Sequence, residues 1–367
     1  MDNTSNQYKN FAAAAEKANK PLMEISMDLT AKERVLSLLR KEKIDRIPCF
    51  SGMGNVTVEG MKRHNISFSK AHRNAKLMAI LAASTYKIFN FESAVAPFDL
   101  CVEAEALGCE VNFYDHITDR IVYPTMKLKK FKVGDDINFD NIGDKGRVPL
   151  IIETIELLKQ DVGNEVAIGS YVLGPFTLAG QITELSDLLK ISFKQPEKVN
   201  NMLQKLADVI IAIAKELKRA GANYLTVREM GAPTDVISPR MFKSLVQPHL
   251  IKVAKNLESP KILHMCGNTN PIVKLMYECG FDAISVEQRN DIAMTRKKLG
   301  KDAIILGNID AYNVLVKGKP ENVKNAVIKA IREGVSGIMP SCDIWPEVPP
   351  ENMKALVEAT KEYGRIS

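Results

Sequence analysis

The sequence is poor in cysteine and contains no long apolar segment. Six cysteines in 367 residues are too few to form a disulfide scaffold. No run approaches the roughly 20 apolar residues that span a bilayer, and the first residues, MDNTSNQYKN, lack the basic and apolar regions of a secretory signal. We therefore expect a cytoplasmic protein that does not contact membranes and whose cysteines are available as metal ligands.

Two common catalytic motifs are also absent. The sequence contains neither the G-x-x-x-x-G-K-[ST] loop that holds nucleotide phosphates nor the G-x-S-x-G turn of serine hydrolases. The formal net charge is only +6, and lysines are spread over helical segments such as 32–43 and 317–329. Solvated helix faces explain this distribution better than a nucleic-acid groove does.

The length and composition are typical of one large globular domain. Hydrophobic residues make up 46% and charged residues 26% of the 367 residues, which is close to the globular average and normal for one α/β barrel. Residues 1–29 are polar and alanine-rich, and we expect them to form a tail or a loosely docked extra helix. Residues 30–367 are predicted to form a single catalytic domain.

From Thr30 onward the sequence alternates between strand and helix patterns. Eight short apolar segments predict buried strands; they begin at Ile47, Glu92, Val166, Ala222, Lys261, Ala283, Ala303 and Gly337. Helical spacing, capping residues or a proline in the first turn predict helices at 30–41, 196–220, 239–257, 320–333 and 350–363. Alternation of eight strands with helices predicts an α/β fold of the TIM (β/α)8 barrel type.

One region interrupts this repeat. Between the second and third predicted strands, residues 99–163 contain the sequence FYDHITDRIVYPTMKL, which is typical of strands and turns. The preceding CVEAEALG is helical in pattern. We therefore expect an insertion here, with a hairpin lying over the mouth of the barrel.

His264 and Cys266 are candidates for metal ligands. They lie two residues apart at the end of one predicted strand, so their side chains point to the same side. Cys342 ends the eighth predicted strand, and the C-terminal ends of barrel strands meet at one mouth. Zinc favours thiolate and imidazole ligands, and catalytic zinc keeps one position open. Glu287, at the end of the next strand, is a candidate for an exchangeable fourth ligand. The alternative interpretation is that the cysteines are ordinary buried core residues.

These residues belong to a longer stretch with a family pattern. HMCGNTNPIVKLMYECGFDAISVEQ, residues 264–288, resembles the zinc motif of the methylcobamide:coenzyme M methyltransferases and the chloromethane-utilisation methyltransferases, within the uroporphyrinogen decarboxylase superfamily. Residues 96–111 and the segments that begin at Leu306 and Glu351 extend the similarity to nearly everything after Thr30. The decarboxylase itself is a poor match, because its arginine-rich N-terminal strand has no counterpart in IPCFSGMGNV.

The resemblance implies a uroporphyrinogen decarboxylase-like barrel in which His264, Cys266 and Cys342 bind zinc. It also implies transfer of a methyl group from a methylated corrinoid, such as methylcobalamin held by a corrinoid-binding partner protein, to a small thiol such as coenzyme M. Zinc would convert the thiol to a thiolate, which is the stronger nucleophile. The segment SCDIWPEVPP departs from the family pattern, so we expect Asp343 and Trp345 to reshape the acceptor pocket.

Further polar residues are expected at the mouth of the barrel. Arg228 or Arg289 would pair with a sulfonate on the acceptor. The other candidates lie at strand ends or follow from family similarity, and they are Glu229, Asn308, Asp310 and Tyr171.

Two other interpretations stay open. The enzyme could pass a methyl group from a donor to Co(I), in which case zinc would activate the donor. Alternatively, the chain is a non-catalytic, uroporphyrinogen decarboxylase-like protein whose zinc site is closed and structural. A homo-oligomer is compatible with all of these interpretations.

Overall fold

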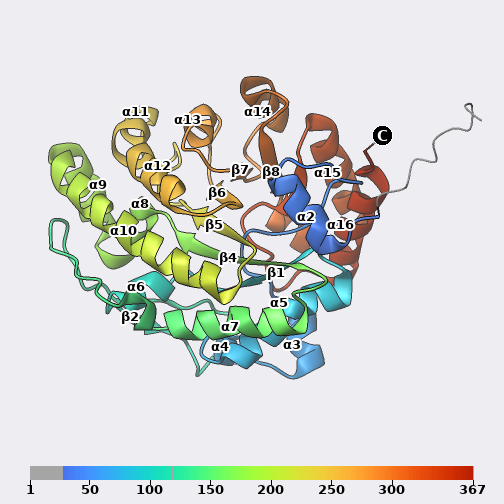
Figure 1. Ribbon diagram of the computed structural model, residues 1–367, viewed down its shortest axis with the longest axis horizontal. Helices are drawn as coiled ribbons and strands as arrows, with labels where there is room; N and C mark the ends of the chain where they lie inside the picture. The colour runs from blue at the N-terminus through green and yellow to red at the C-terminus, as the bar shows by residue number, and fades with distance from the viewer. Residues whose placement is uncertain (1–27, 118–119, 367) are drawn as a thin grey trace, which may run out of the picture.

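The computed structural model describes residues 28–117 and 120–366. Their centre is a parallel sheet of seven strands in the order β1-β4-β5-β6-β7-β8-β9, which curls on itself in Figure 1. The strands are β1 (Ser93–Ala96), β4 (Ala167–Leu173), β5 (Tyr224–Arg228), β6 (Lys261–Met265), β7 (Ala283–Val286), β8 (Ile304–Ile309) and β9 (Gly337–Pro340). The predicted TIM-type α/β fold is confirmed. The tail or helix predicted at 1–29 falls outside the described residues, except for its last two.

The first of the eight predicted strands is not a regular strand. The segment after Ile47 nevertheless lies between β9 and β1, because Phe50 N–H donates to the Ile338 carbonyl at 3.1 Å and Glu92 N–H donates to the Cys49 carbonyl at 2.9 Å. Pro48 has no N–H to donate and accepts from Ile338 instead. The segment therefore closes the ring with isolated hydrogen bonds. Seven of the eight predicted strands are regular, and the prediction of a strand after Ile47 was wrong.

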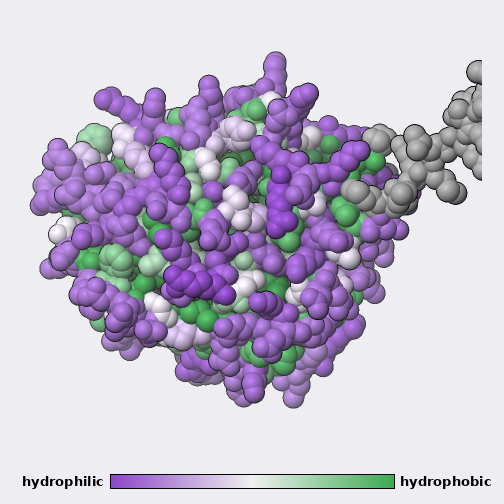
Figure 2. Space-filling model, viewed as in Figure 1, coloured by the Kyte–Doolittle hydropathy of each residue, from purple (hydrophilic) through white to green (hydrophobic). Residues whose placement is uncertain are grey.

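Helices cover the outer face of the sheet, as Figure 1 shows. They are α5 (Ala75–Phe89), α7 (Val148–Asp161), α10 (Pro196–Ala220), α12 (Gln247–Asn256), α13 (Val273–Tyr277), α14 (Ile292–Leu299), α15 (Pro320–Glu333) and α16 (Pro350–Tyr363). Their buried faces and the outward side chains of the strands form the larger part of the core. On the face seen in Figure 2, hydrophilic side chains cover these helices and hydrophobic ones show only in small separate areas.

The helix predicted at 239–257 is divided into three segments. It begins as α11 (Pro239–Met241), continues as a π-helical turn (Phe242–Val246) and ends as α12. Pro248 has no N–H and its ring crowds the preceding turn, so the regular hydrogen-bond pattern fails there. The helices predicted at 196–220, 320–333 and 350–363 have the predicted bounds.

The other α-helices precede β1, lie between β1 and the insertion hairpin, or connect β4 to α10. They are α2 (Ala31–Leu39), α3 (Val58–His64), α4 (Phe68–Ala71), α6 (Val102–Ala106), α8 (Pro175–Ile182) and α9 (Leu185–Lys194). In α2, Thr30 and Glu33 form the predicted capping box. The apolar face of α2 packs on inward side chains of the sheet, including Phe50, Tyr224 and Ile304, and closes the end of the barrel opposite the strand C-termini.

The predicted insertion forms between β1 and β4. It contains an antiparallel hairpin of β2 (Glu110–Asn112) and β3 (Thr125–Leu128), followed by a short 3-10 turn (Ile142–Asp144) before α7. The hairpin reaches the C-terminal ends of the strands, where Tyr123, just before β3, and Met126, within β3, line the same cavity as Cys342. Within the described residues, no helix combines the length and apolar character needed to cross a membrane.

Candidate metal centre and its cavity

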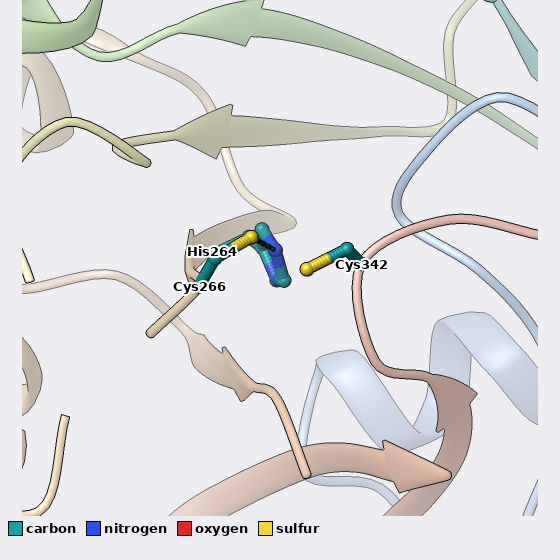
Figure 3. Close-up of side chains that lie close together, drawn as sticks. All are labelled: His264, Cys266 and Cys342. Carbon is teal, nitrogen blue, oxygen red and sulfur yellow. Dashed lines mark hydrogen bonds between the residues drawn. The ribbon is translucent and has the colours of Figure 1, made fainter. Parts of the chain in front are cut away.

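Three predicted ligands converge at the C-terminal end of the sheet. His264 lies in β6, Cys266 follows the end of that strand, and Cys342 follows β9. One ligand atom from each lies within 4.8 Å of the other two. Figure 3 shows the side chains pointing toward one another from these two parts of the chain. The structure therefore brings together residues that are 76 positions apart in the sequence.

The orientation of the His264 ring follows from strand pairing. His264 is paired with Arg228 of β5 on one side and with Ser285 of β7 on the other. Its Nδ1 lies 3.0 Å from the Ser285 hydroxyl, and its Nε2 lies 3.2 Å from Cys266 Sγ. When Nδ1 carries the proton and donates to Ser285, the lone pair of Nε2 faces the two sulfurs, as a metal ligand requires.

The donor set fits zinc. Two sulfurs and one imidazole nitrogen form the usual soft set, and tetrahedral zinc places such atoms about 3–4 Å from one another. The hydrogen bond from the Cys342 thiol, together with His264 and Arg228, holds the pKa of Cys266 well below its ordinary value despite burial. The thiolate, which is the form that binds metals, is thus favoured at this position.

Glu287 lies next to Cys342, although it is not part of the group whose ligand atoms lie within 4.8 Å of one another. Its Oε2 is 3.9 Å from Cys342 Sγ, and the side chain is almost fully buried. The other oxygen is ion-paired with Arg289, which also contacts Asp235 at 3.1 Å. One carboxylate oxygen thus lies near Cys342 while the other is held by a cation, an arrangement compatible with a fourth, exchangeable ligand.

A cavity of about 610 Å³ opens beside Cys342, a volume within the range of small-molecule sites. One wall comes from the ends of β5 and β9, with Arg228, Asp343 and Trp345, and the other comes from the insertion, with Tyr123 and others. Apolar side chains predominate among the lining residues. A small molecule in this cavity can therefore reach the sulfur of Cys342 while its remaining atoms contact a mostly apolar wall.

Arg228 is buried at the side of this cavity. Its Nη2 donates to Asp343 Oδ2 at 2.7 Å, and its Nη1 donates to Oδ1 at 3.3 Å. The guanidinium lies 4.7 Å from the centre of the Tyr171 ring, and the Tyr171 hydroxyl donates to the Asp99 carbonyl at 2.8 Å. Burial raises the pKa of Asp343, and Arg228 opposes that rise. The Tyr171 ring thus packs against the guanidinium of Arg228, and Tyr171 does not itself line the cavity.

Three other predicted candidates lie away from this cavity. Glu229 is fully buried and accepts hydrogen bonds from the N–H groups of Phe176 and Thr177, at the start of α8; burial raises its pKa to about 7. Asn308 donates to the carbonyl of Asn290 at 3.0 Å and lines a separate, more polar hollow together with Asp310. None of the three contacts the metal cluster through its side chain among the interactions of the described residues.

Ser285 was not among the predicted site residues. A signal for it was nevertheless present, because Ser285 precedes Glu287 by two residues on a strand and therefore points to the same side. The side chains of the insertion that line the cavity carried no comparable signal, since their position depends on how the hairpin folds over the strand ends.

Comparison with known proteins assigns this chain to a family. The family model described as uroporphyrinogen decarboxylase matches residues 30–363. Methylcobamide:CoM methyltransferases from Methanosarcina barkeri and Methanosarcina acetivorans are each 32% identical to the chain, over 92% of it and 99% of their own length. A solved structure of a methyltransferase from Methanosarcina mazei superposes with a TM-score of 0.84 at 29% identity, covering 92% of this chain and 99% of that one.

The chain therefore belongs to the uroporphyrinogen decarboxylase family. Within that family it is a methyltransferase, since relatives that are 32% identical to it over 99% of their length are methyltransferases, and so is the solved structure that superposes on it at 29% identity.

Proposed function

We propose that this enzyme transfers a methyl group from a methylated corrinoid, carried by a corrinoid-binding protein, to a small thiol activated by zinc. The observation that carries the proposal is the convergence of His264, Cys266 and Cys342, of which Cys342 lines a cavity suited to a small molecule. The relatives named for transfer from a cobamide to CoM support the choice of donor and acceptor classes.

The chain's own residues divide the work at this site. His264, Cys266 and Cys342 would hold the zinc, with Ser285 fixing the His264 ring. Glu287 would occupy the fourth position until the thiol arrives, and Arg289 would then retain the displaced carboxylate. Zinc bound there lowers the pKa of an incoming thiol and makes its sulfur a nucleophile at neutral pH.

The proposed transfer balances without a further reagent. The sulfur forms a bond to the methyl carbon as the cobalt–carbon bond breaks, and both electrons of that bond leave with cobalt as Co(I). The thiol proton passes to water. Tyr123, Met126 and Trp345 give the cavity an apolar wall opposite and beside Cys342.

The experiment combines metal analysis with an assay of methyl transfer. We expect about one zinc per chain and conversion of methylcobalamin plus a thiol to a thioether, followed by the loss of the cobalt–carbon absorbance and by mass spectrometry. Chelation should abolish the activity and added zinc should restore it. Absence of a thioether with every thiol tested would refute the proposal.

Cys342→Ser separates a catalytic from a structural metal. The variant should lose zinc, and its rate of methyl transfer should fall at least about a thousandfold. Its circular dichroism and thermal midpoint should stay close to those of the wild type. Cys279→Ser is the matched control, because Cys279 donates to the Leu275 carbonyl at the end of α13 and a serine hydroxyl keeps that bond. Unfolding of Cys342→Ser, with Cys279→Ser intact, would instead favour a structural zinc.

A further inference from the structure

The cavity beside Cys342 has an unusual charge balance for an enzyme with an anionic acceptor. Among its described lining residues, Arg228 is the one cationic side chain, and the carboxylates are Asp99, Asp343 and Glu347. The charge of Asp99 is neutralised by Arg147, which does not line the cavity and donates to both carboxylate oxygens at 2.7 and 2.9 Å. Asp343 and Glu347 therefore face the single positive charge of Arg228, which leaves an excess of negative charge on the wall.

Both Nη groups of Arg228 are occupied, and its Nε, which has no hydrogen-bond partner among the described residues, is fully buried. Arginine recognises sulfonates and carboxylates through two parallel N–H groups. Both Nη atoms of Arg228 donate to Asp343, Nη2 also contacts the Met230 sulfur at 3.4 Å, and one face of the guanidinium lies on Tyr171. The side chain is also almost completely buried, so it cannot turn toward another partner without breaking these contacts.

Arg289, the other arginine near the cluster, is likewise occupied. It is paired with Glu287 and with Asp235 at 3.1 Å, outside the cavity. Both arginines that the sequence offers for an anionic acceptor are thus held by carboxylates of this chain. An acceptor that carried its own negative charge would approach Asp343 at short range in a partly desolvated site, where like charges repel strongly.

We propose that the acceptor of this enzyme is a small thiol without negative charge, neutral or cationic, and that Asp343 is the residue that selects it. The inference rests on the proposed function for the identity of the reacting group. An amino or hydroxyl group on the acceptor can donate a hydrogen bond to Asp343, whose side chain is 30% exposed and lines the cavity next to Cys342. A sulfonate has no donor to offer there, and the one cation among the described lining residues, Arg228, is already paired with Asp343.

Three thiols of equal length test this selection by charge. 2-Mercaptoethanesulfonate, 2-mercaptoethanol and 2-aminoethanethiol carry charges of −1, 0 and +1 on the same two-carbon chain. For the zinc-loaded wild type, kcat/KM with methylcobalamin as donor should be at least about tenfold lower for the sulfonate than for the better of the other two. Calorimetric binding of each thiol, without a methyl donor, should show the same order.

Two variants of Asp343 assign the selection to its charge. Asp343→Asn removes the charge and frees Arg228, so the ratio of sulfonate to neutral thiol should rise at least about tenfold over wild type. Asp343→Glu keeps the charge and should keep the wild-type order. Asp302→Asn, in an exposed turn before β8, is the remote control and should change nothing. Intrinsic thiol reactivity cancels, because each thiol is compared between variant and wild type.

The outcomes separate this inference from the proposed function. Preference of the wild type for the sulfonate, or an unchanged ratio in Asp343→Asn, would overturn the inference while methyl transfer stands. Absence of methylation with all three thiols would refute the proposed function, and the calorimetric order would still decide the inference. In the calorimetric measurement, binding of the sulfonate as tight as or tighter than that of the other two thiols would also overturn the inference.

Discussion

His264 is held at the cluster by a neighbour on the next strand. The Ser285 hydroxyl lies 3.0 Å from Nδ1 and fixes which ring nitrogen faces Cys266. Partners of this kind orient metal-ligating histidines, and their loss typically weakens metal binding tenfold to a hundredfold. The strand pairing of His264 with Ser285 leaves little room for another side chain to take over this contact.

Ser285→Ala is therefore expected to weaken zinc binding by about ten- to a hundredfold while the fold stays intact. Competition with a chromophoric chelator measures the affinity. Ser244→Ala serves as the control, because Ser244 is exposed and lies in the π-helical turn, outside the strands that carry His264 and Ser285. An affinity within about twofold of wild type would show that the Ser285 hydroxyl does not orient the ligand.

Glu103 is a buried carboxyl outside the metal cluster. It lies in α6 and accepts a hydrogen bond at 2.8 Å from the N–H of Leu173, the last residue of β4. Burial raises its pKa from 4.5 to about 7, the Leu173 N–H and Arg147 oppose the rise, and Asp99 adds to it. Because the folded pKa exceeds the unfolded value, the contribution to stability is complete below about pH 4.5 and is lost as the pH rises through 7.

Glu103→Gln removes this ionisation and keeps an oxygen acceptor for Leu173. Between pH 5.5 and 8.5 the unfolding free energy of the variant, relative to wild type, should shift in its favour by about 2 kcal/mol. Urea unfolding of both proteins at the two pH values measures this shift. A difference between the proteins that does not change with pH would contradict the account.

At the scale of elements, regular segments followed the sequence closely. The helices at 196–220, 320–333 and 350–363 have the predicted bounds because a proline opens each one and apolar residues recur at helical spacing. The segment after Ile47 did not form the predicted strand, since Pro48 interrupts its hydrogen bonding. The position of a strand followed from local pattern, whereas its regularity depended on whether its own residues had N–H groups to donate.

The candidate ligands were predictable for a related reason. His264, Cys266 and Cys342 stand at strand ends, and a parallel barrel brings strand ends together. The ion pair between Arg228 and Asp343 was not predicted, because it joins side chains 115 residues apart whose rotamers depend on the packed cavity wall. The sequence thus indicated which residues reach the mouth, and tertiary packing decided which of them meet.

The turn after β6 sets the position of Cys266. Gly267 has a φ of 78°, and a Cβ there would lie 2.6 Å from Pro233 Cβ. Gly280 has a similar φ of 85° but nothing within 4 Å of its Cβ position, so it isolates the backbone contribution.

Gly267→Ala should therefore destabilise the protein by about 1–3 kcal/mol more than Gly280→Ala does, and only the former should lower zinc occupancy. Denaturant unfolding gives the stabilities, and metal analysis of the purified variants gives the occupancy. Equal effects of the two substitutions on both quantities would show that the contact with Pro233 does not position Cys266.

At the scale of the whole molecule, the insertion and the strand ends together form one open site. Trp345 lies at its rim, 43% exposed, with its ring centre 4.9 Å from that of Tyr312. It is the single tryptophan of the chain, so intrinsic tryptophan fluorescence reports on this rim alone.

Titration with hydroxocobalamin should quench the Trp345 emission in a saturable manner, because the proposed function places a corrinoid over this opening. Free N-acetyltryptophanamide at equal absorbance controls for light absorbed by the corrinoid. Quenching of the protein no greater than that of the free indole would show that free corrinoid does not approach the rim. The same titration of Tyr312→Ala tests whether the aromatic pair contributes to binding.

The central claim is that a thiol binds directly to zinc held by His264, Cys266 and Cys342. Zinc X-ray absorption spectroscopy measures this most directly. In the resting protein we predict two sulfur and two nitrogen or oxygen ligands, with Glu287 among the latter. Addition of a methyl-accepting thiol should change this to three sulfurs and one nitrogen. A ligand set that stays unchanged at a saturating thiol concentration would contradict the account, because it would show that no thiol binds to the zinc.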